Sequence, residues 1–535
     1  MGLFVCGGWV ALLLFLWPQL LFETHEGIFS GAMTLWSDWS AHFTYASHLA
    51  YHPMSQWTTN HPLFLGTPFN YPFATHLFSA LLLRMGIGHV NAHLLPTMAF
   101  MSGLVVFLFL FYKNCTGSFQ QAAAGLSLAL LGGSLGFVRT LPAILASDAP
   151  LKNLFFPPET LHLYPELHLE VGGTFSTLLI PQRTLQLGIF LGMSVLYCLQ
   201  LSSQAEFNSR KRVLLGSLWA LVWAVLPSVH IHSFVAVSIT VGIFHLFHFK
   251  QLKHLAPFFL IGFLGSVSVL YGLHRQGNYE SFLAWQPFWL AGNSAEHPIH
   301  PLLFWWLNWS MFLPLAFLGL WRCKSSRNCF VITGLVLFIS VNFIRFQPWD
   351  WDNTKLLLWS YMLLIPSAIA YLSQLWNQKS LLNKTAVIVL FAGMILTGGL
   401  DLMRLLHGRK IAHVMYTREQ LSLAQEFKNI LKPNDVVLVA PSHHEWVSAL
   451  SGGQILLGYE GWLWTYGINY SGRLEEIGEM LSGGPLSLNL IGRYGVRYAV
   501  FDSSTASKYN EQFFKDRFKR ILVSPSIRVY QLNNS

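Results

Sequence analysis

The chain has 535 residues, of which 53% are hydrophobic, 15% aromatic and only 11% charged. Soluble globular proteins carry roughly 25% charged residues, so this composition excludes an ordinary soluble protein. The net charge of +9 does not indicate nucleic-acid binding, because the basic residues do not gather on one soluble face.

Runs of about 20 apolar residues recur along the chain, and such runs are typical of membrane-spanning helices. The first run has no basic stretch before it and no small-residue cleavage site after it, so we interpret it as a retained span rather than a signal peptide. The sequence predicts eleven spans: 4–22, 92–112, 118–139, 184–201, 213–229, 232–248, 257–273, 302–321, 329–345, 357–376 and 385–404.

The connections between these spans alternate in character. One set is short and basic, with eleven basic residues against a single acid, Glu206. The positive-inside rule assigns this set, and with it the N-terminus, to the cytoplasm. The other set is longer and richer in His, Trp, Pro and acids, and we expect it on the exported side: 23–91, 140–183, 274–301 and 346–356.

Residues 73–87 are apolar, but the segment is short and carries His76 and Arg84. Counting it as a span would invert every later loop and place the basic residues outside. We therefore expect a juxtamembrane helix that lies at the outer interface.

The first exported loop opens with two tryptophans around Asp38, followed by several histidines. Asp38 and His42 are four residues apart, so they would share one face of a helix. Such a pair suits a general base with a hydrogen-bonding helper, or two ligands of a divalent metal such as Mg²⁺ or Mn²⁺. An interfacial helix whose polar face carries these residues explains the pattern equally well. Asn70 and Tyr71, later in the loop, are candidate substrate-binding residues.

The second exported loop carries Glu166, His168 and Glu170, and it ends with Gln182 and Arg183 at the start of a span. On an extended segment the two acids and the histidine would share one face, whereas on a helix only the two acids would align. An arginine at a membrane boundary can hold a phosphate in a bidentate fork, or simply extend to lipid headgroups. We take Arg183 as a candidate phosphate ligand and the two acids and Gln182 as candidate substrate-binding residues.

Residues 345–355, which read RFQPWDWDNTK, form an exported turn that is dense in acids, amides and bases. A turn that only joined two spans would need none of these groups, so the pattern predicts a polar cavity. Its tryptophans also suit an interfacial aromatic belt. The candidate residues are the catalytic Asp352, the phosphate ligands Lys355 and Arg345, and the substrate-binding Trp349, Asp350 and Asn353.

From about residue 405 the composition changes, and strand patterns alternate with helical stretches. This favours a small α/β domain. We expect a transmembrane domain over 1–404 and an exported α/β domain over 405–535, with strands at 435–440, 498–502 and 527–532 and helices near 444–451 and 471–481. No glycine-rich phosphate loop, HExxH or paired CxxC is present, so soluble nucleotide chemistry is unsupported.

The layout resembles the GT-C superfamily of integral-membrane glycosyltransferases, which use polyprenyl-phosphate-linked sugars. The resemblance covers essentially the whole chain, from the first span and its exported loop to the exported C-terminal domain. Four short motifs are similar to a group of uncharacterised bacterial members: Asn60-His61-Pro62-Leu63-Phe64, Asn70-Tyr71-Pro72, Pro181-Gln182-Arg183-Thr184 and Pro348-Trp349-Asp350-Trp351-Asp352-Asn353-Thr354-Lys355.

The resemblance implies an α-helical polytopic enzyme of a bacterial inner membrane that transfers a hexosyl or pentosyl group. The donor is a polyprenyl-phosphate-linked sugar, and the acceptor is a lipid, glycan or protein of the cell envelope. The resemblance also implies that Asp38 is the catalytic base of an inverting reaction. The Asp-Glu pair of protein O-mannosyltransferases is absent, because Trp39 follows Asp38, so their acceptor specificity does not carry over.

Two other classes of protein remain open. A polytopic transporter or lipid flippase also needs many spans, but it favours charged or Gly/Pro-broken segments at mid-membrane and internal repeats. Here the polar residues gather on one side. A non-catalytic membrane scaffold offers no reason for the acids, amides and bases of the 346–356 turn.

Overall fold

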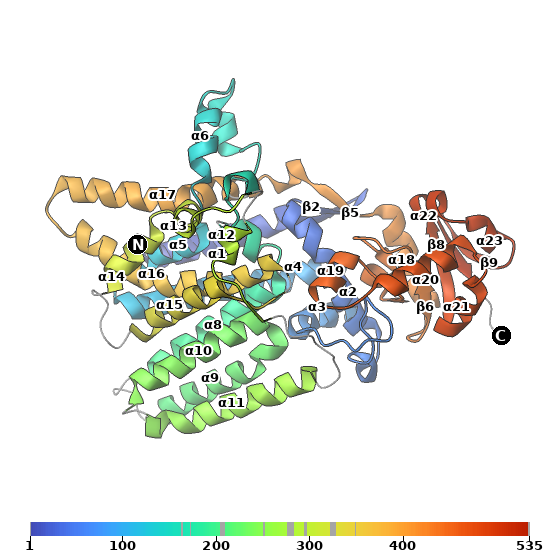
Figure 1. Cartoon of the computed structure of the whole chain (residues 1–535), viewed down its shortest axis with the longest axis horizontal. Coiled ribbons are helices and arrows are strands. Elements are labelled where there is room, and N and C mark those ends of the chain that lie inside the picture. Colours follow the sequence, from blue (N-terminus) through green and yellow to red (C-terminus); the bar gives the residue numbers. More distant parts are fainter. Residues whose placement is uncertain are drawn as a thin grey trace. The chain divides into compact units, whose positions relative to one another are not determined.

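The computed structural model describes residues 2–161, 164–171, 173–203, 209–249, 252–274, 283–293, 297–320, 328–347 and 349–532. The chain forms two compact units (Figure 1). The first unit comprises Met1–Gln19, Thr97–Gly272 and Ser281–Ile411. The second comprises Leu20–Pro96, Leu273–Glu280 and Ala412–Ser535, so it combines the first loop expected on the exported side with the C-terminal region.

The first unit is built from helices, because in lipid only a helix satisfies the backbone N–H and C=O groups of an isolated apolar segment. Its helices are α1 (Gly2–Leu20), most of α4 (His89–Thr116), α5 (Phe119–Leu131), α6 (Gly136–Leu145), α7 (Pro150–Phe155), α8 (Arg183–Ser202), α9 (Ser209–Val229), α10 (Ile231–Phe247), most of α11 (Leu252–His274), α12 (Trp289–Gly292), α13 (Pro301–Trp309), α14 (Phe312–Gly319), α15 (Asn328–Phe343), α16 (Thr354–Trp376) and α17 (Leu381–Leu405). It also contains the turns η2 (Pro165–Leu167), η3 (Thr174–Leu179), η7 (Asp350–Asn353) and η8 (Gly408–Ile411), and the paired strands β3 (Ala284–Trp285) and β4 (Ile344–Arg345).

Among the described residues, seven helices are long and apolar enough to cross a membrane, or nine if each of two bent helix pairs is one span. Two shorter apolar helices, α10 and α15, cover the remaining expected segments. Each expected segment therefore coincides with a helix or a bent pair, while the number of eleven spans stays a prediction. The pattern is that of an integral, multi-pass membrane protein.

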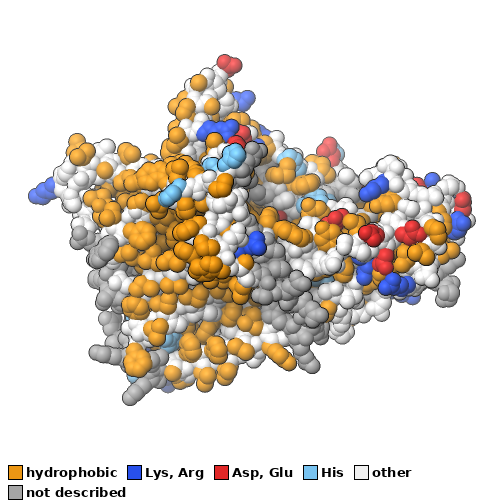
Figure 2. All heavy atoms as spheres, in the orientation of Figure 1, with side chains coloured by type: hydrophobic (Ala, Val, Ile, Leu, Met, Phe, Trp, Pro, Cys, Tyr) orange, Lys and Arg blue, Asp and Glu red, His pale blue; other side chains and the backbone are white. Residues whose placement is uncertain are grey.

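Apolar side chains face outward from these helices. On α11, for example, Leu260, Phe263 and Val267 are all exposed. In water such surface costs about 25 cal/mol per Å², whereas in lipid it costs nothing. On the face drawn in Figure 2, apolar side chains cover the helices of the first unit, and many of the charged side chains lie over the C-terminal part of the second.

Two segments expected to be single straight spans are bent instead. The segment 118–139 forms α5 and α6, which meet at 82°, and the segment 302–321 forms α13 and α14, which meet at 95°. The first break falls at Gly132 and Gly133, and the second at Ser310, whose φ is +52°. Glycine has little helix propensity and Ser310 adopts a left-handed φ, so neither helix continues.

Helix α16 lies at the centre of the first unit, and its side chains are buried from Thr354 to Ile369. A Cβ at Gly319 of α14 would lie 1.9 Å from the backbone oxygen of Ser367, so the two helices approach closely only because this residue is glycine. On another face, the indole nitrogen of Trp359 donates to the hydroxyl of Ser233 on α10 at 3.0 Å. These contacts fix the position of the helix that begins at the 346–356 turn.

The N-terminal part of the second unit contains α2 (Met33–Tyr51), η1 (Met54–Gln56), α3 (Ala74–Arg84) and the first turns of α4. Helices α2 and α3 pack through an alanine- and leucine-rich core. The guanidinium of Arg84 donates to the carbonyl oxygens of Leu49, Ala50 and His52, so it caps the end of α2. The 73–87 segment is thus a packed helix, and its place at the membrane interface stays a prediction.

A three-stranded sheet joins this part to the C-terminal region of the same unit. Strand β2 (Gly27–Ser30) pairs antiparallel with both β1 (Leu21–Thr24) and β5 (His413–Thr417). Gly27 has φ +145°, and a Cβ there would lie 2.1 Å from the backbone oxygen of Tyr416. The close pairing therefore requires glycine.

The C-terminal part is an α/β fold with a five-stranded sheet in the order β7-β6-β8-β10-β9. The strands β7 (Gln454–Ile455), β6 (Val436–Leu438) and β8 (Val496–Asp502) are parallel, and β10 (Ile527–Gln531) is antiparallel to β8 and β9 (Lys519–Val523). Its helices are α18 (Arg418–Ile430), η9 (Val447–Ser451), α19 (Glu460–Thr465), α20 (Ser471–Ser482), α21 (Ser487–Tyr494), α22 (Ser503–Lys508) and α23 (Glu511–Lys515). Strands β6, β8 and β10 occupy the expected positions, whereas β7 and β9 were not expected.

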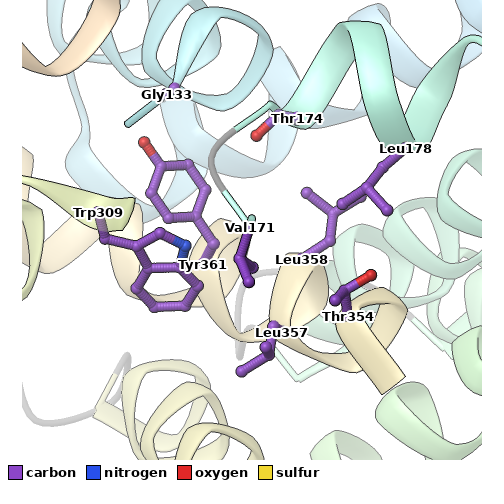
Figure 3. Close-up of a pocket in the computed structure, with 10 residues that line it drawn as sticks. Gly133, Val171, Thr174, Leu178, Trp309, Thr354, Leu357, Leu358 and Tyr361 are labelled. Carbon is purple, nitrogen blue, oxygen red and sulfur yellow. The ribbon is translucent and has the colours of Figure 1, made fainter. Parts of the chain in front are cut away.

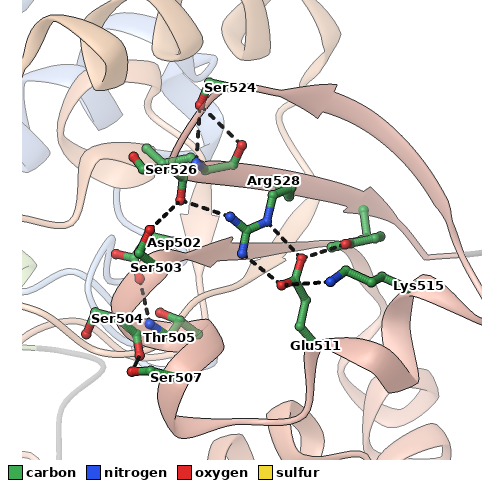
Figure 4. Close-up of polar contacts among 12 residues, drawn as sticks. Asp502, Ser503, Ser504, Thr505, Ser507, Glu511, Lys515, Ser524, Ser526 and Arg528 are labelled. Atoms are coloured by element: carbon green, nitrogen blue, oxygen red, sulfur yellow. Dashed lines mark hydrogen bonds and ion pairs between the residues drawn. The ribbon is translucent and has the colours of Figure 1, made fainter.

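A buried ion pair holds α23 against this sheet (Figure 4). Two nitrogens of Arg528 on β10 donate to the carboxylate of Glu511 at 2.8 and 2.7 Å, and the hydroxyl of Tyr530 donates to it at 2.7 Å. Burial alone would raise the pKa of Glu511, but these hydrogen bonds and the charges of Arg528 and Lys515 outweigh burial and lower the pKa to about 2.

Candidate active site

Asp38 lies in the second turn of α2 in the second unit. Leu35 and the residues from Trp39 to Ala50 are buried, but Asp38 and its neighbour Ser37 are only half-buried. The Ser37 hydroxyl donates to Oδ1 of Asp38 at 3.3 Å. A carboxylate that stays accessible at the edge of a packed helix can exchange a proton with a bound ligand, which is the requirement for a general base.

His42, one turn beyond Asp38, packs inside the unit. It is buried, and its ring stacks on that of His76 from α3, with centroids 5.1 Å apart. Within the described chain, no group of three or more His, Cys, Asp or Glu side chains could hold a metal ion. Asp38 and His42 would supply two ligands. Because Mg²⁺ completes its coordination with waters and substrate phosphates, two protein ligands can suffice, and metal binding here stays a prediction.

Aromatic side chains continue the stripe of α2 that carries Asp38 and His42. Tyr45 follows at the i+7 position, and its hydroxyl donates to that of Tyr466, after α19, at 2.8 Å. The half-buried ring of Tyr71 lies 4.9 Å from Tyr45 and 5.4 Å from Tyr466. The sequence analysis missed both partners of Tyr71. The i+7 spacing was an available signal for Tyr45, and nothing in the sequence indicated Tyr466.

The 346–356 turn of the first unit contains an ion pair. Nζ of Lys355 donates to Oδ1 of Asp352 at 2.7 Å, and the two side chains are 11% and 15% exposed. Asn353 is buried and closes the turn, because its amide accepts from the Phe346 N–H and donates to the Trp349 carbonyl. The structure therefore brings Asp352 and Lys355 together and assigns Asn353 to the backbone of the turn.

For the other candidate site residues of this turn, the described part of the structure shows no contact that indicates a role. Trp349 is 43% exposed, and Arg345 is half-buried in β4, where it pairs with Ala284 of β3. Pro348 and the side chain of Asp350 lie outside the described residues. It stays a prediction that Trp349 and Asp350 bind substrate. The same holds for phosphate binding by Arg345.

A histidine that the sequence analysis did not select lies beside this ion pair. His232, at the start of α10, is within electrostatic range of both Asp352 and Lys355. Its neighbour His230 caps the helix, accepting from the backbone N–H of Ser233 at 3.2 Å. The turn between α9 and α10 and the 346–356 turn therefore lie near each other in the first unit.

The second exported loop forms a tight turn around its acidic residues. Residues 165–167 form a tight helical turn closed by a bridge between Tyr164 and Leu169, so the two acids do not share a strand face. Glu166 is exposed and pairs with Arg139 at 2.8 Å. The backbone N–H of Glu170 is held by the side-chain oxygen of Asn308 on α13 at 2.8 Å. Proline at the start of the turn is the local cause.

Arg183 is the first residue of α8, and it is fully buried. Its Nε donates to the hydroxyl of Thr97 on α4 at 3.0 Å. This burial excludes an arginine that extends to lipid headgroups. Gln182 precedes the helix and is half-buried. Phosphate binding by Arg183 and substrate binding by Gln182 stay predictions.

A small pocket of about 10 Å³, with room for about one water molecule, lies between α5, η3, α13 and α16 of the first unit (Figure 3). The rings of Trp309 and Tyr361 form one wall, 5.3 Å apart, and Leu178 and Leu357 contribute to the apolar lining. Thr354, which also lines the pocket, directly precedes Lys355.

The comparisons with known proteins agree with this architecture. No protein-family model matches the sequence, and no curated protein matches it. Among solved structures, apo ArnT from Cupriavidus metallidurans is similar with a TM-score of 0.51 and 11% identity over 98% of each chain. The apo Archaeoglobus fulgidus oligosaccharyltransferase gives a TM-score of 0.55 and 9% identity over 97% of this chain and 73% of that one. Arabinofuranosyltransferase AftD from Mycobacteria gives a TM-score of 0.51 and 12% identity, over 99% of this chain and 41% of that one.

These proteins are membrane glycosyltransferases of the GT-C superfamily, and the chain shares their fold. The resemblance to this superfamily that the layout of the chain predicted is therefore confirmed at the level of the fold, while the similarity of the four short motifs to bacterial members stays a prediction. The archaeal oligosaccharyltransferase has also been solved in complex with Zn and sulfate, with a TM-score of 0.54 to this chain.

Proposed function

We propose that the protein is a membrane glycosyltransferase that moves a sugar from a polyprenyl-phosphate-linked donor to a cell-envelope acceptor on the non-cytoplasmic face. The fold supports this class of activity, although one fold can host many reactions, so the proposal depends on the site. The observation that carries it is Asp38. It is a half-buried carboxylate on a helix whose side chains are mostly buried, and it follows the first span of a glycosyltransferase fold.

In the proposed reaction, the carboxylate of Asp38 takes the proton of an acceptor hydroxyl. The acceptor oxygen then forms a bond to the anomeric carbon as the bond from that carbon to the phosphate oxygen breaks. The lipid phosphate leaves with the electron pair, and the anomeric carbon is inverted. General-base assistance of this kind contributes roughly 10²–10⁴ in rate.

The proposal assigns the donor to the first unit. The Lys355 ammonium is the cation nearest to the apolar pocket along the chain, and it would balance the charge of the leaving phosphate. Arg183 is a second candidate cation, but its burial would require movement before a phosphate could reach it.

The test uses the purified full chain in nanodiscs with polyprenyl-phosphate-linked sugars as donors. Asp38→Asn keeps the shape of the side chain but cannot accept the proton, so we expect transfer to fall by roughly 10²–10⁴. Asp148→Asn, at an exposed carboxylate of the first unit, is the matched control and should transfer sugar normally.

Transfer at the normal rate by a folded Asp38→Asn variant would remove the base assignment. Movement of the lipid-linked sugar across the bilayer without transfer would favour a flippase instead. Mass spectrometry of envelope glycolipids and glycoproteins with and without the protein would identify the missing sugar.

A further inference from the structure

Helices α6 and α7, residues 136–155, form a hairpin arm that stands out from the other helices of the first unit (Figure 1). Helix α6 meets α5 at 82°, so it does not continue the direction of that helix. Both ends of the arm contact α17. The hydroxyl of Thr397 accepts from the backbone N–H of Phe137 at 3.2 Å. A guanidinium nitrogen of Arg404 donates to the carbonyl oxygen of Pro157, just after α7, at 2.6 Å.

These two contacts give the depth of the hairpin arm along a membrane span. Helix α17 rises about 1.5 Å per residue, so Lys384 near its start and Arg404 near its end are about 30 Å apart, the thickness of a bilayer's hydrocarbon core. Asp401, the only charged residue between them, is buried. Thr397 lies about 20 Å from Lys384, and α5 is also about 20 Å long where it ends before the arm. The arm therefore leaves the bundle about two-thirds of the way across the core, on the side that the predicted topology places outside.

Helix α6 has one buried face and one exposed apolar face. The buried face consists of residues four apart: Gly136, Thr140 and Ile144. The opposite face carries exposed or half-buried apolar side chains at i, i+3, i+4 and i+7: Val138, Leu141, Pro142 and Leu145. On α7, Leu151 and Phe155 at i and i+4 are both exposed. Figure 2 shows apolar side chains along this projecting part of the molecule. Both helices of the arm thus direct apolar side chains away from the bundle.

The depth of the arm indicates what covers these apolar side chains. Contiguous exposed apolar surface marks contact with a membrane or with another protein. Two-thirds of the way across the hydrocarbon core, the medium around a helix bundle consists of acyl chains. Ile388 and Val389 on α17 are exposed in the same way, as expected of side chains that face lipid. The arm adds a surface of the same kind beside the outer end of this span.

The charged residues of the arm agree with a position near the lipid headgroups. Arg139, on the flank of the apolar face of α6, pairs with Glu166 at 2.8 Å and lies over the ring of Tyr164. Asp148, between the two helices, and Lys152, on α7, are exposed. A helix with an apolar face and charged residues beside it lies in the membrane plane, with the apolar face about 5–10 Å into the boundary between headgroups and acyl chains.

We propose that the hairpin arm is a lipid-binding element. It lies in the plane of the exported leaflet, with its apolar side chains among the acyl chains of membrane lipids and its charged residues at the headgroups. In place of the second half of the span expected over 118–139, the chain turns into the membrane plane at α6. The proposal does not depend on glycosyl transfer, because it rests on the depth and the surface of the arm.

The test uses the full chain in nanodiscs of phosphatidylethanolamine and phosphatidylglycerol, with photoreactive benzoylphenylalanine replacing one residue at a time. Leu145 and Leu151 are replaced on the arm, and Ile388 on α17 is the lipid-facing reference. Leu488, on α21 of the second unit, is the matched control, because its side chain is 55% exposed against 59% for Leu145. Mass spectrometry identifies the photoadducts. We expect lipid adducts at both arm positions to be as abundant as at Ile388 and about tenfold more abundant than at Leu488.

A second experiment tests whether the apolar face holds the arm in lipid. Leu145→Glu combined with Leu151→Glu changes only exposed side chains, so the melting temperature of the protein should not change. Because carboxylates are costly among acyl chains, lipid adducts of a photolabel at Phe155 should fall about tenfold in this double variant. Leu145→Ile combined with Leu151→Ile is the conservative control. It keeps the apolar surface and should retain the adducts.

Three results would overturn the proposal. Adducts between the Leu145 photolabel and a second copy of the chain would assign the arm to an interface between copies. Adducts with neither lipid nor protein, or equal lipid yields at Leu145 and Leu488, would place the arm in water. Unchanged lipid adducts at Phe155 in the double glutamate variant would show that the apolar face does not hold the arm in the leaflet.

Discussion

The side chains of Asp352 and Lys355 illustrate how one residue pair can serve both stability and binding. Both are largely buried, with 2.7 Å between Nζ and Oδ1. Removing one partner of such a pair leaves an uncompensated buried charge, which typically costs about 3–5 kcal/mol. Loss of activity on mutation of Lys355 would therefore not distinguish a phosphate ligand from a structural cation.

A neutral double variant separates these roles. We expect Lys355→Met to lose both stability and affinity for the lipid-phosphate donor. Asp352→Asn combined with Lys355→Met removes both charges, so it should recover most of the stability and still bind the donor weakly. Thermal unfolding and a donor-binding titration, run in parallel on the three proteins, measure the two effects. Recovery of donor affinity in the double variant would show that Lys355 only balances Asp352.

The sequence indicated which residues of the 346–356 turn carry charge, but not which groups these residues contact. Asn353 has the same residue type as a substrate-binding amide, yet its hydrogen bonds go to Phe346 and Trp349. His232 is 120 residues from Asp352 in the chain. Its proximity arises from the packing of α10 on α16, which no local pattern encodes.

Among the secondary-structure elements, the segment between β6 and η9 is held by a buried carboxylate, that of Glu445. Its carboxylate accepts from the N–H groups of Val447 and Ser448 at 3.1 and 2.9 Å, and it is buried. Burial, with a further contribution from the charge of Asp502, raises the pKa of Glu445 to about 7 despite these hydrogen bonds. In the unfolded chain a glutamate has a pKa of about 4.3.

A raised pKa means that the folded state holds the proton more tightly than the unfolded state. The stabilisation is complete below about pH 4.3 and is lost as the pH rises through 7. Glu445→Gln does not titrate, so its free energy of unfolding relative to wild type should improve by roughly 3 kcal/mol between pH 4.5 and pH 8. Denaturant unfolding at several pH values measures the difference. Parallel pH dependences for the two proteins would contradict the burial argument.

The secondary-structure elements were largely predictable because lipid and burial impose simple periodicities. Apolar runs gave α1, α4, α8, α9, α11, α16 and α17, and the strand patterns gave β6, β8 and β10. The bends at Gly132 and Ser310 were not predicted, since apolar composition continues through both breaks. Two-residue strands such as β7 are too short to show any alternation.

At the scale of the whole molecule, the sequence predicted a division near residue 405, whereas the compact units follow three-dimensional packing. Strand β2 pairs with β5, so the segment from Leu20 to Pro96 belongs with the C-terminal region in the second unit. Pairing between strands nearly 400 residues apart leaves no local trace. The composition of the second unit could therefore be recognised only from the structure.

The second unit should also be sensitive to acid, because it buries histidines in their neutral form. Burial lowers the pKa of His48 and of His61 to about 3, and nearby histidines lower that of His48 further. In the unfolded chain the value is about 6.5. Below pH 6.5 the unfolded state therefore binds protons that the folded state does not, and stability falls as the pH falls.

Well below pH 6.5 each histidine contributes about 1.4 kcal/mol per pH unit, so the two together remove about 3 kcal/mol between pH 6.5 and pH 5. We expect limited proteolysis at pH 5 to cut the second unit while the helices of the first unit stay protected. His61→Asn can still accept from the backbone N–H of Leu63, which His61 accepts at 3.1 Å, but it cannot take up a proton. It should therefore reduce the acid sensitivity. If the variant and wild type are cleaved at the same rate at pH 5 and at pH 7, the buried histidines do not set the acid limit of the fold.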